Sequence, residues 1–121
     1  MYTVTVREHM MIAHSLPDPF FGPAQKMHGA TYVVDAEFSS PTLNQHNVVV
    51  DIGAATDALK ATLDELNYQN LDELPQFQGH ITTTEFLAHY IFGKIHERMP
   101  VPGTLKITLN ESHVASASYS D

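Results

Sequence analysis

Histidines and carboxylates are the residues of this sequence that can do acid–base or metal chemistry, because the chain has eight histidines and no cysteine. The lack of cysteine excludes disulfides, cysteine-ligated zinc and a thiol nucleophile. Imidazole nitrogens bind metals or move protons near neutral pH. The spacing of the histidines therefore decides which chemistry the chain can support.

Three histidines lie where neighbouring strands would bring polar groups together. His14 ends one alternating stretch, His28 opens the next, and His113 follows two residues after Glu111. Residues i and i+2 of a regular strand face the same side, so His113 is a candidate acid–base group or ligand beside Glu111, unless a bend breaks the alternation. The other five share no spacing and are predicted to be surface or interface residues: His9, His46, His80, His89 and His96.

Two kinds of periodicity predict the elements that carry these residues. Alternation of polar and apolar residues predicts strands over residues 2–13, 28–39, 105–110 and 113–119. Apolar residues spaced by three and four predict one helix from residue 55 and another from residue 82. Thr82 and Glu85 fit a capping box for the second helix. Three prolines and a glycine predict a loop over residues 16–27.

This order of elements predicts an α+β fold with ββααββ topology. We expect one domain over residues 1–121, in which two helices cover one face of an antiparallel four-stranded sheet. Both edges of such a sheet stay open in one chain. Open edges pair readily with another copy, and closing a barrel across subunits would remove them.

Charge and hydropathy narrow the class of partner. Acidic residues outnumber basic ones by 14 to 6, which gives a formal net charge of −8. Nucleic acids and anionic membranes require a basic face, so neither is expected as a partner. The first residues lack the apolar run of a signal peptide or a membrane span, which predicts a soluble, cytoplasmic protein.

Four local patterns together resemble the 6-pyruvoyl tetrahydropterin synthase family, which includes the bacterial 6-carboxytetrahydropterin synthases. They are Ile12-Ala13-His14, His28 through Tyr32, Leu66 through Asp72, and Thr82 through Glu85 with Asn110-Glu111-Ser112. The resemblance covers nearly the whole chain. It implies the tunnelling fold, in which three subunits close a twelve-stranded barrel, two trimers stack into a hexamer, and the active sites lie between subunits.

The resemblance also implies a zinc site, which this chain completes only in part. The family binds zinc through three histidines, one ending the first strand and two at the start of the second. Here His14 and His28 match, but Ala30 occupies the third position. Two imidazoles are fewer than the three protein ligands of a catalytic zinc, so we expect no metal cofactor.

The catalytic positions that the resemblance implies are changed as well. The family cysteine corresponds to Ala24, and its Asp-His pair corresponds to Asn67 and Tyr68. Near pH 7 these side chains cannot replace a thiolate and a carboxylate-polarised imidazole. We therefore expect a divergent member that does not catalyse the parent reaction.

The positions that would hold a pterin ring are kept. Glu111 matches the family glutamate that accepts from the ring N3–H and the 2-amino group, and a carboxylate suits such a paired donor edge. Thr83 and Thr84 match the ring contacts at the start of the second helix. Lys26 is either a solvated loop residue or a partner for an anionic ligand tail.

Three functions follow from these matches and departures. The first is a hexameric protein that binds a pterin- or purine-like small molecule as a carrier, sensor or pathway accessory. The alternative is a metal-independent lyase or aldolase-type enzyme that acts on a pterin side chain, with Tyr68, Lys26 or His113 as acid–base groups. A structural oligomer with an empty pocket explains Glu111 least well. Consumption or mere retention of a dihydroneopterin derivative distinguishes the first two.

Overall fold

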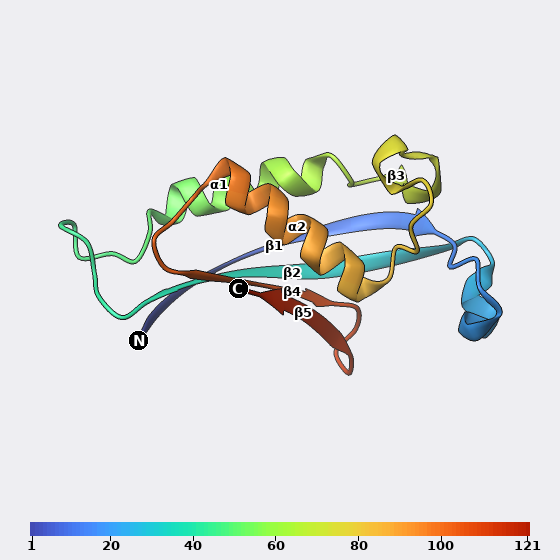
Figure 1. Ribbon diagram of the computed structural model, residues 1–121, viewed down its shortest axis with the longest axis horizontal. Coiled ribbons are helices and arrows are strands. Elements are labelled where there is room, and N and C mark those ends of the chain that lie inside the picture. The colour runs from blue at the N-terminus through green and yellow to red at the C-terminus, as the bar shows by residue number, and fades with distance from the viewer.

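The computed structural model describes residues 1–121. Its strands are β1 (Tyr2–His14), β2 (His28–Ser40), β3 (Gln69–Asn70), β4 (Thr104–Asn110) and β5 (Ser116–Ser120). Its α-helices are α1 (Ile52–Asp64) and α2 (Thr84–Arg98), and three short 3-10 helices are η1 (Pro19–Gln25), η2 (Leu71–Glu73) and η3 (Pro75–Phe77). Figure 1 shows both α-helices on one face of the sheet, with the other face open. The predicted α+β class is confirmed.

The sheet has five strands in the order β3-β1-β2-β4-β5, one more than the sequence predicts. The additional strand, β3, pairs in parallel with Ile12 and Ala13 of β1. It is two residues long, which is too short for an alternating pattern to reveal it. The other strands pair antiparallel, as predicted. The last strand begins at Ser116 instead of residue 113, because the chain bends over residues 111–114.

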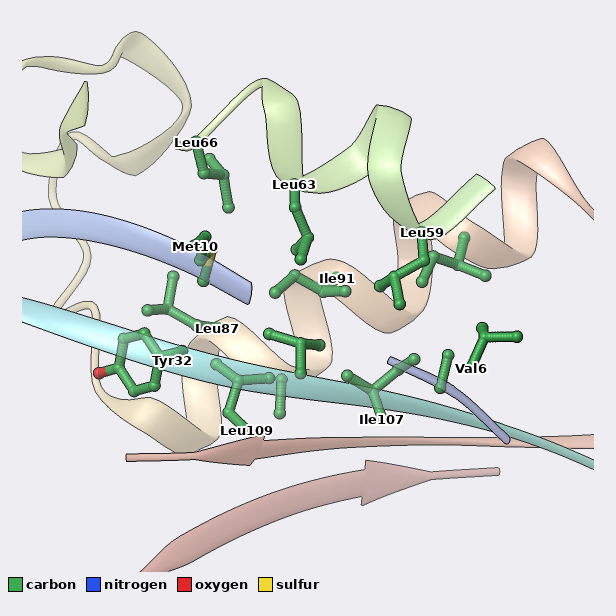
Figure 2. Packing of buried hydrophobic residues seen from close by; sticks show 14 of the residues in the cluster. Val6, Met10, Tyr32, Leu59, Leu63, Leu66, Leu87, Ile91, Ile107 and Leu109 are labelled. Carbon is green, nitrogen blue, oxygen red and sulfur yellow. The ribbon is translucent and has the colours of Figure 1, made fainter. Parts of the chain in front are cut away.

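The helix-covered face of the sheet carries the hydrophobic core. The long β1–β2 pair sets Val6 opposite Ala36 and Met10 opposite Tyr32, so their side chains share one face. Figure 2 shows these side chains packed against leucines and isoleucines of α1, α2 and β4. Burying one such side chain stabilises a protein by about 1.5–3 kcal/mol. The predicted apolar stripes of both helices are confirmed by their buried residues: Ala55, Ala58, Leu59, Leu63, Leu87, Ala88, Ile91 and Ile95.

The β1–β2 register also places the candidate site residues. His14 lies opposite His28 at the end of the hairpin, and Ala30 lies opposite Ile12. These positions continue the row of core residues, so they belong to the helix-covered face. In Figure 1 the start of α2, β3 and the β4–β5 turn all lie at this same end of the sheet.

The connection between α2 and β4 passes close to β2 at Gly103. A Cβ atom on Gly103, which lies between α2 and β4, would overlap the carbonyl oxygen of Ser39 in β2. Only glycine therefore fits this position without a shift of the backbone.

None of the helices combines the length and the apolar character that crossing a lipid bilayer requires.

Candidate functional site

Three consecutive threonines at the start of α2 have three different partners. Thr82 Oγ1 lies 3.0 Å from Nδ1 of His14. Thr83 is the N-cap of α2, and its hydroxyl accepts a hydrogen bond from the Phe86 N–H at 3.1 Å. Thr84 Oγ1 lies 3.3 Å from the Tyr32 hydroxyl. The prediction that Thr82 caps this helix is wrong, because its hydroxyl turns to the buried imidazole and Thr83 satisfies the helix amide instead.

His14 is a buried imidazole with its own polar contacts. It is 3% exposed, and its ring packs edge-on against that of His28 with the centroids 4.6 Å apart. Burial lowers the pKa of His14, and the neighbouring His28 lowers it further, while Asp72 acts in the opposite direction. A lowered pKa favours the neutral imidazole at physiological pH, which suits a ring that packs against a second imidazole.

His28 is held from the loop side of the site. Its Nδ1 donates to the backbone carbonyl of Lys26 at 2.8 Å. In the neutral ring this bond leaves the lone pair on Nε2. The side chain of Lys26 is exposed, so in the single chain only its backbone takes part in this site.

A three-histidine metal site cannot form at this place. Ala30, the third position, presents a methyl group where an imidazole would be needed. No cluster of three or more His, Cys, Asp or Glu side chains in the protein has a geometry that could hold a metal ion. The residues present therefore do not fit the three-ligand zinc centre that the resemblance implies.

All three positions that the resemblance assigns to catalysis take part in hydrogen bonds with the backbone. Ala24 lies in η1, and its carbonyl accepts from the Leu16 N–H at 3.0 Å, which closes the loop between β1 and β2. The Asn67 side chain accepts from the Met11 N–H at 2.9 Å at the edge of β1. The Tyr68 N–H donates to the Met11 carbonyl at 2.7 Å, while its side chain is 78% exposed. Asn67 thus has a structural partner, which the sequence alone did not suggest.

Glu111 lies in the turn between β4 and β5. Its N–H donates to the Ala115 carbonyl at 3.0 Å, while the side chain is exposed. The carboxylate lines a shallow hollow of about 410 Å³ that also includes Arg7, Asn110 and His113. Because β4 ends at Asn110, the strand alternation that would align His113 with Glu111 does not apply, although both residues reach the same hollow.

Tyr32 contacts the start of α2 through its hydroxyl. The ring is 1% exposed, and Figure 2 shows it in the core with its hydroxyl directed away from the other labelled side chains. Burial raises the pKa of Tyr32, and the charges of Glu111 and Glu85 raise it further, whereas the bond to Thr84 lowers it. The phenol therefore stays neutral and can donate a hydrogen bond near Glu111 and Thr84.

The sequence did not indicate Tyr32 or Asp72 as site residues. Tyr32 follows the core alternation of β2, and this conceals that its hydroxyl reaches the end of the sheet. Both carboxylate oxygens of Asp72 accept from the backbone N–H of Ser15, and one also accepts from its hydroxyl. Asp72 thus fixes the chain directly after His14. Only the position of Asp72 at the end of the Leu66–Asp72 pattern could have indicated it.

The sequence profile of the 6-pyruvoyl tetrahydropterin synthase family matches residues 3–121. The chain belongs to this family. Membership agrees with the fold and with the resemblance noted from the four local patterns. No curated protein matches the chain at the sequence level.

Solved structures of other proteins have the same fold. The Caenorhabditis elegans 6-pyruvoyl tetrahydropterin synthase superimposes with a TM-score of 0.87 at 21% identity, over 99% of this chain and 95% of that one. The Plasmodium falciparum enzyme gives 0.80 at 15% identity, over 99% and 97%. An uncharacterized protein from Wolinella succinogenes, WS1659, gives 0.73 at 16% identity, over 99% and 98%. At these identities the matches establish the fold.

Proposed function

We propose that this chain binds a pterin- or purine-like heterocycle and does not catalyse the 6-pyruvoyl tetrahydropterin synthase reaction. The observation that carries the proposal is the contrast between two groups of side chains at one end of the sheet. Glu111, with Thr83, Thr84 and Tyr32, offers hydrogen-bonding groups for a ring. The positions expected to supply chemistry hold alanine, asparagine and tyrosine.

The ring-binding part is supported by the geometry around Tyr32. Its phenol lies 3.3 Å from the Thr84 hydroxyl, so polar groups of β2 and α2 meet here, and the charge of Glu111 in the β4–β5 turn raises its pKa. Glu111 would accept from an amino-pyrimidinone edge, and the Thr83 hydroxyl, which uses only an acceptor site for the cap, keeps its proton to donate. Pterins and guanine share that edge.

The loss of the parent activity is supported by three of the changed positions. Ala24 has no nucleophile, and Asn67 is already engaged by the Met11 N–H. Ala30 leaves His14 and His28 without a third metal ligand. Zinc is therefore not part of the proposed function, and the two imidazoles serve as polar groups packed against each other.

Assembly into a hexamer, a dimer of trimers, is part of the proposal. The outer side of β1 pairs with β3 only at Ile12 and Ala13, and β5 is the opposite edge of the sheet. β1 and β5 run in opposite directions, because each of the three junctions between them is antiparallel. A ring of copies could thus join β5 of one to β1 of the next as an antiparallel pair and close a barrel.

Such a junction would complete the site. The β4–β5 turn with Glu111 and the segment before β3 with Tyr68 lie at the same end of the sheet but at opposite edges. Joining the edges of two copies brings Glu111 of one toward Tyr68 of the other. The proposed partners are therefore a small heterocycle and further copies of this chain, and a cytoplasmic location stays a prediction.

A metal-independent lyase is the alternative, favoured by one observation. His113 reaches the same hollow as Glu111, so an imidazole would lie near a ligand held by that carboxylate. Incubation with dihydroneopterin triphosphate and with dihydroneopterin, followed by chromatography, separates the two functions. Unchanged substrate with measurable binding supports a binding protein, and product formation would establish an enzyme. Native mass spectrometry of the purified protein reports subunit number, metal and retained heterocycle together.

A further inference from the structure

One residue of the protein has a backbone conformation that does not suit its side chain. Four residues have a left-handed φ: Gly22, Gly79, Asn47 and Tyr68. Glycine adopts this conformation freely, and asparagine does so at small cost. Tyr68, with a φ of 61°, is the one bulky side chain among them, and such a residue is a true outlier.

Hydrogen bonds to β1 hold this conformation. The Tyr68 N–H donates to the Met11 carbonyl at 2.7 Å, and the preceding Asn67 side chain accepts from the Met11 N–H at 2.9 Å. Both backbone groups of Met11 are thus engaged. Neither bond uses the side chain of Tyr68, so asparagine at position 68 would keep both and reduce the strain.

The fold gains little from the aromatic ring. Tyr68 is 78% exposed and does not join the hydrophobic core cluster or the residues packed against it. The backbone cost is therefore not offset by burial. Strained residues of this kind persist where a function requires their position.

The position of Tyr68 suggests what the ring contacts. It immediately precedes β3 at the end of the sheet that also holds the β4–β5 turn. A ligand held by its edge at Glu111 exposes two flat faces. An exposed aromatic ring on the neighbouring copy can cover one of them by stacking, which is worth about 1–3 kcal/mol for a nucleic-acid base.

We propose that Tyr68 is a ligand-contacting residue, which stacks its ring on the heterocycle that Glu111 of the neighbouring copy holds. This inference rests on the proposed function. The aromatic ring of Tyr68 contacts the heterocycle and its hydroxyl does not, because stacking needs only an aromatic face. The left-handed backbone at Tyr68 orients the ring toward the heterocycle.

Neopterin is the probe for the test, because its fluorescence reports binding and the chain has no tryptophan to interfere. Tyr68→Asn removes the ring and keeps a residue that suits the backbone, whereas Tyr68→Phe keeps the ring. Tyr2→Asn is the matched control, since Tyr2 is 51% exposed at the opposite end of β1.

We expect Tyr68→Asn to raise the Kd for neopterin about 5- to 150-fold, with a Tm that is unchanged or higher. Tyr68→Phe should bind within about twofold of wild type, as should Tyr2→Asn. Wild-type affinity in Tyr68→Asn, or a marked fall in its Tm, would overturn this inference. If Glu111→Gln abolishes binding while Tyr68→Asn does not, this inference alone fails. If the wild type does not bind neopterin, both it and the proposed function fail.

Discussion

His14 and Thr82 are 68 positions apart in the sequence and meet through a 3.0 Å contact between Nδ1 and Oγ1. Both residues are buried. The contact joins the end of β1 to the segment that leads into α2. It thereby fixes the distance between the histidine pair and the Thr84–Tyr32 contact two residues further along the chain.

Replacing Thr82 by valine should lower the free energy of unfolding by about 1–3 kcal/mol, because it leaves a buried imidazole nitrogen without its partner. Valine has nearly the same shape as threonine, so packing changes little. Urea unfolding measures the loss. The control is Thr104→Val, at an exposed position, which should change stability by less than about 0.5 kcal/mol. Equal effects of the two substitutions would contradict a stabilising role for the contact.

The purified protein should carry no stoichiometric zinc, because Ala30 leaves two imidazoles where a catalytic site needs three ligands. Elemental analysis after dialysis against a mild chelator checks this. Ala30→His should raise zinc affinity, since position 30 shares a strand face with His28 and lies opposite Ile12, two residues from His14. One zinc per chain in the wild type would contradict the prediction, and the exposed-face variant Thr31→His controls for added imidazole.

Glu111→Gln should weaken binding of neopterin by about 2–4 kcal/mol, or roughly 30- to 1,000-fold. The amide loses the charge-assisted pair and turns a donor toward a donor. Calorimetric titration measures the change, with Glu73→Gln, at an exposed position in η2, as the control. Equal affinity in Glu111→Gln and wild type would remove Glu111 from the site.

Sedimentation equilibrium should give a hexamer of about 80 kDa at micromolar concentration, because β5 and most of the outer side of β1 are free to pair. Mixing provides a sharper test. Glu111→Gln and Tyr68→Asn chains, refolded together in equal amounts, should recover about one quarter of the wild-type sites, since each site takes one residue from each neighbour. A monomer would refute the assembly, and no recovery from the mixture would place both residues in one chain.

Stability should depend on pH through Asp35. Arg7 donates to it from Nε at 2.6 Å and from Nη2 at 3.0 Å, and this pairing holds the pKa of Asp35 below its usual value. The native state then binds fewer protons than the unfolded state. The stabilisation is complete above the unfolded pKa of about 3.9 and is lost as pH falls through the folded pKa.

Asp35→Asn should therefore lower the Tm at neutral pH, and the difference from wild type should narrow as pH falls below about 4. Thermal unfolding across this range measures it. Asp57→Asn, at an exposed position in α1, controls for the loss of one negative charge. A difference that is constant with pH would show that the ion pair does not contribute.

The main elements were predictable because their signals are periodic. The alternation from Tyr32 to Phe38 and the leucine spacing in α1 depend on which face is buried, and burial is what selects those residues. β3 was not predictable, because two residues carry no period and its pairing with Ile12 is set by the position of the whole α1–α2 connection.

The candidate site was harder to predict, because its contacts join residues distant in sequence. Adjacent Thr82 and Thr83 are equally good caps by local chemistry, and only the position of His14 decides between them. Asn67 resembles a damaged catalytic residue in sequence, yet it binds the Met11 backbone. Tyr32 has the periodicity of a core residue, and its hydroxyl reaches the site because the start of α2 brings Thr84 to it.

Gly103 is constrained by the backbone around it and not by a ligand or a side-chain contact. The carbonyl of Ser39 occupies the space that any side chain at position 103 would need. A substitution at position 103 therefore affects folding itself, before it can affect the binding of a ligand or a partner. Positions 24 and 30 already hold a Cβ atom, and position 68 holds a full aromatic side chain on a left-handed backbone. Substitution at the histidine end of the sheet therefore changes side-chain chemistry, whereas substitution in the passage from α2 to β4 at the other end displaces the backbone.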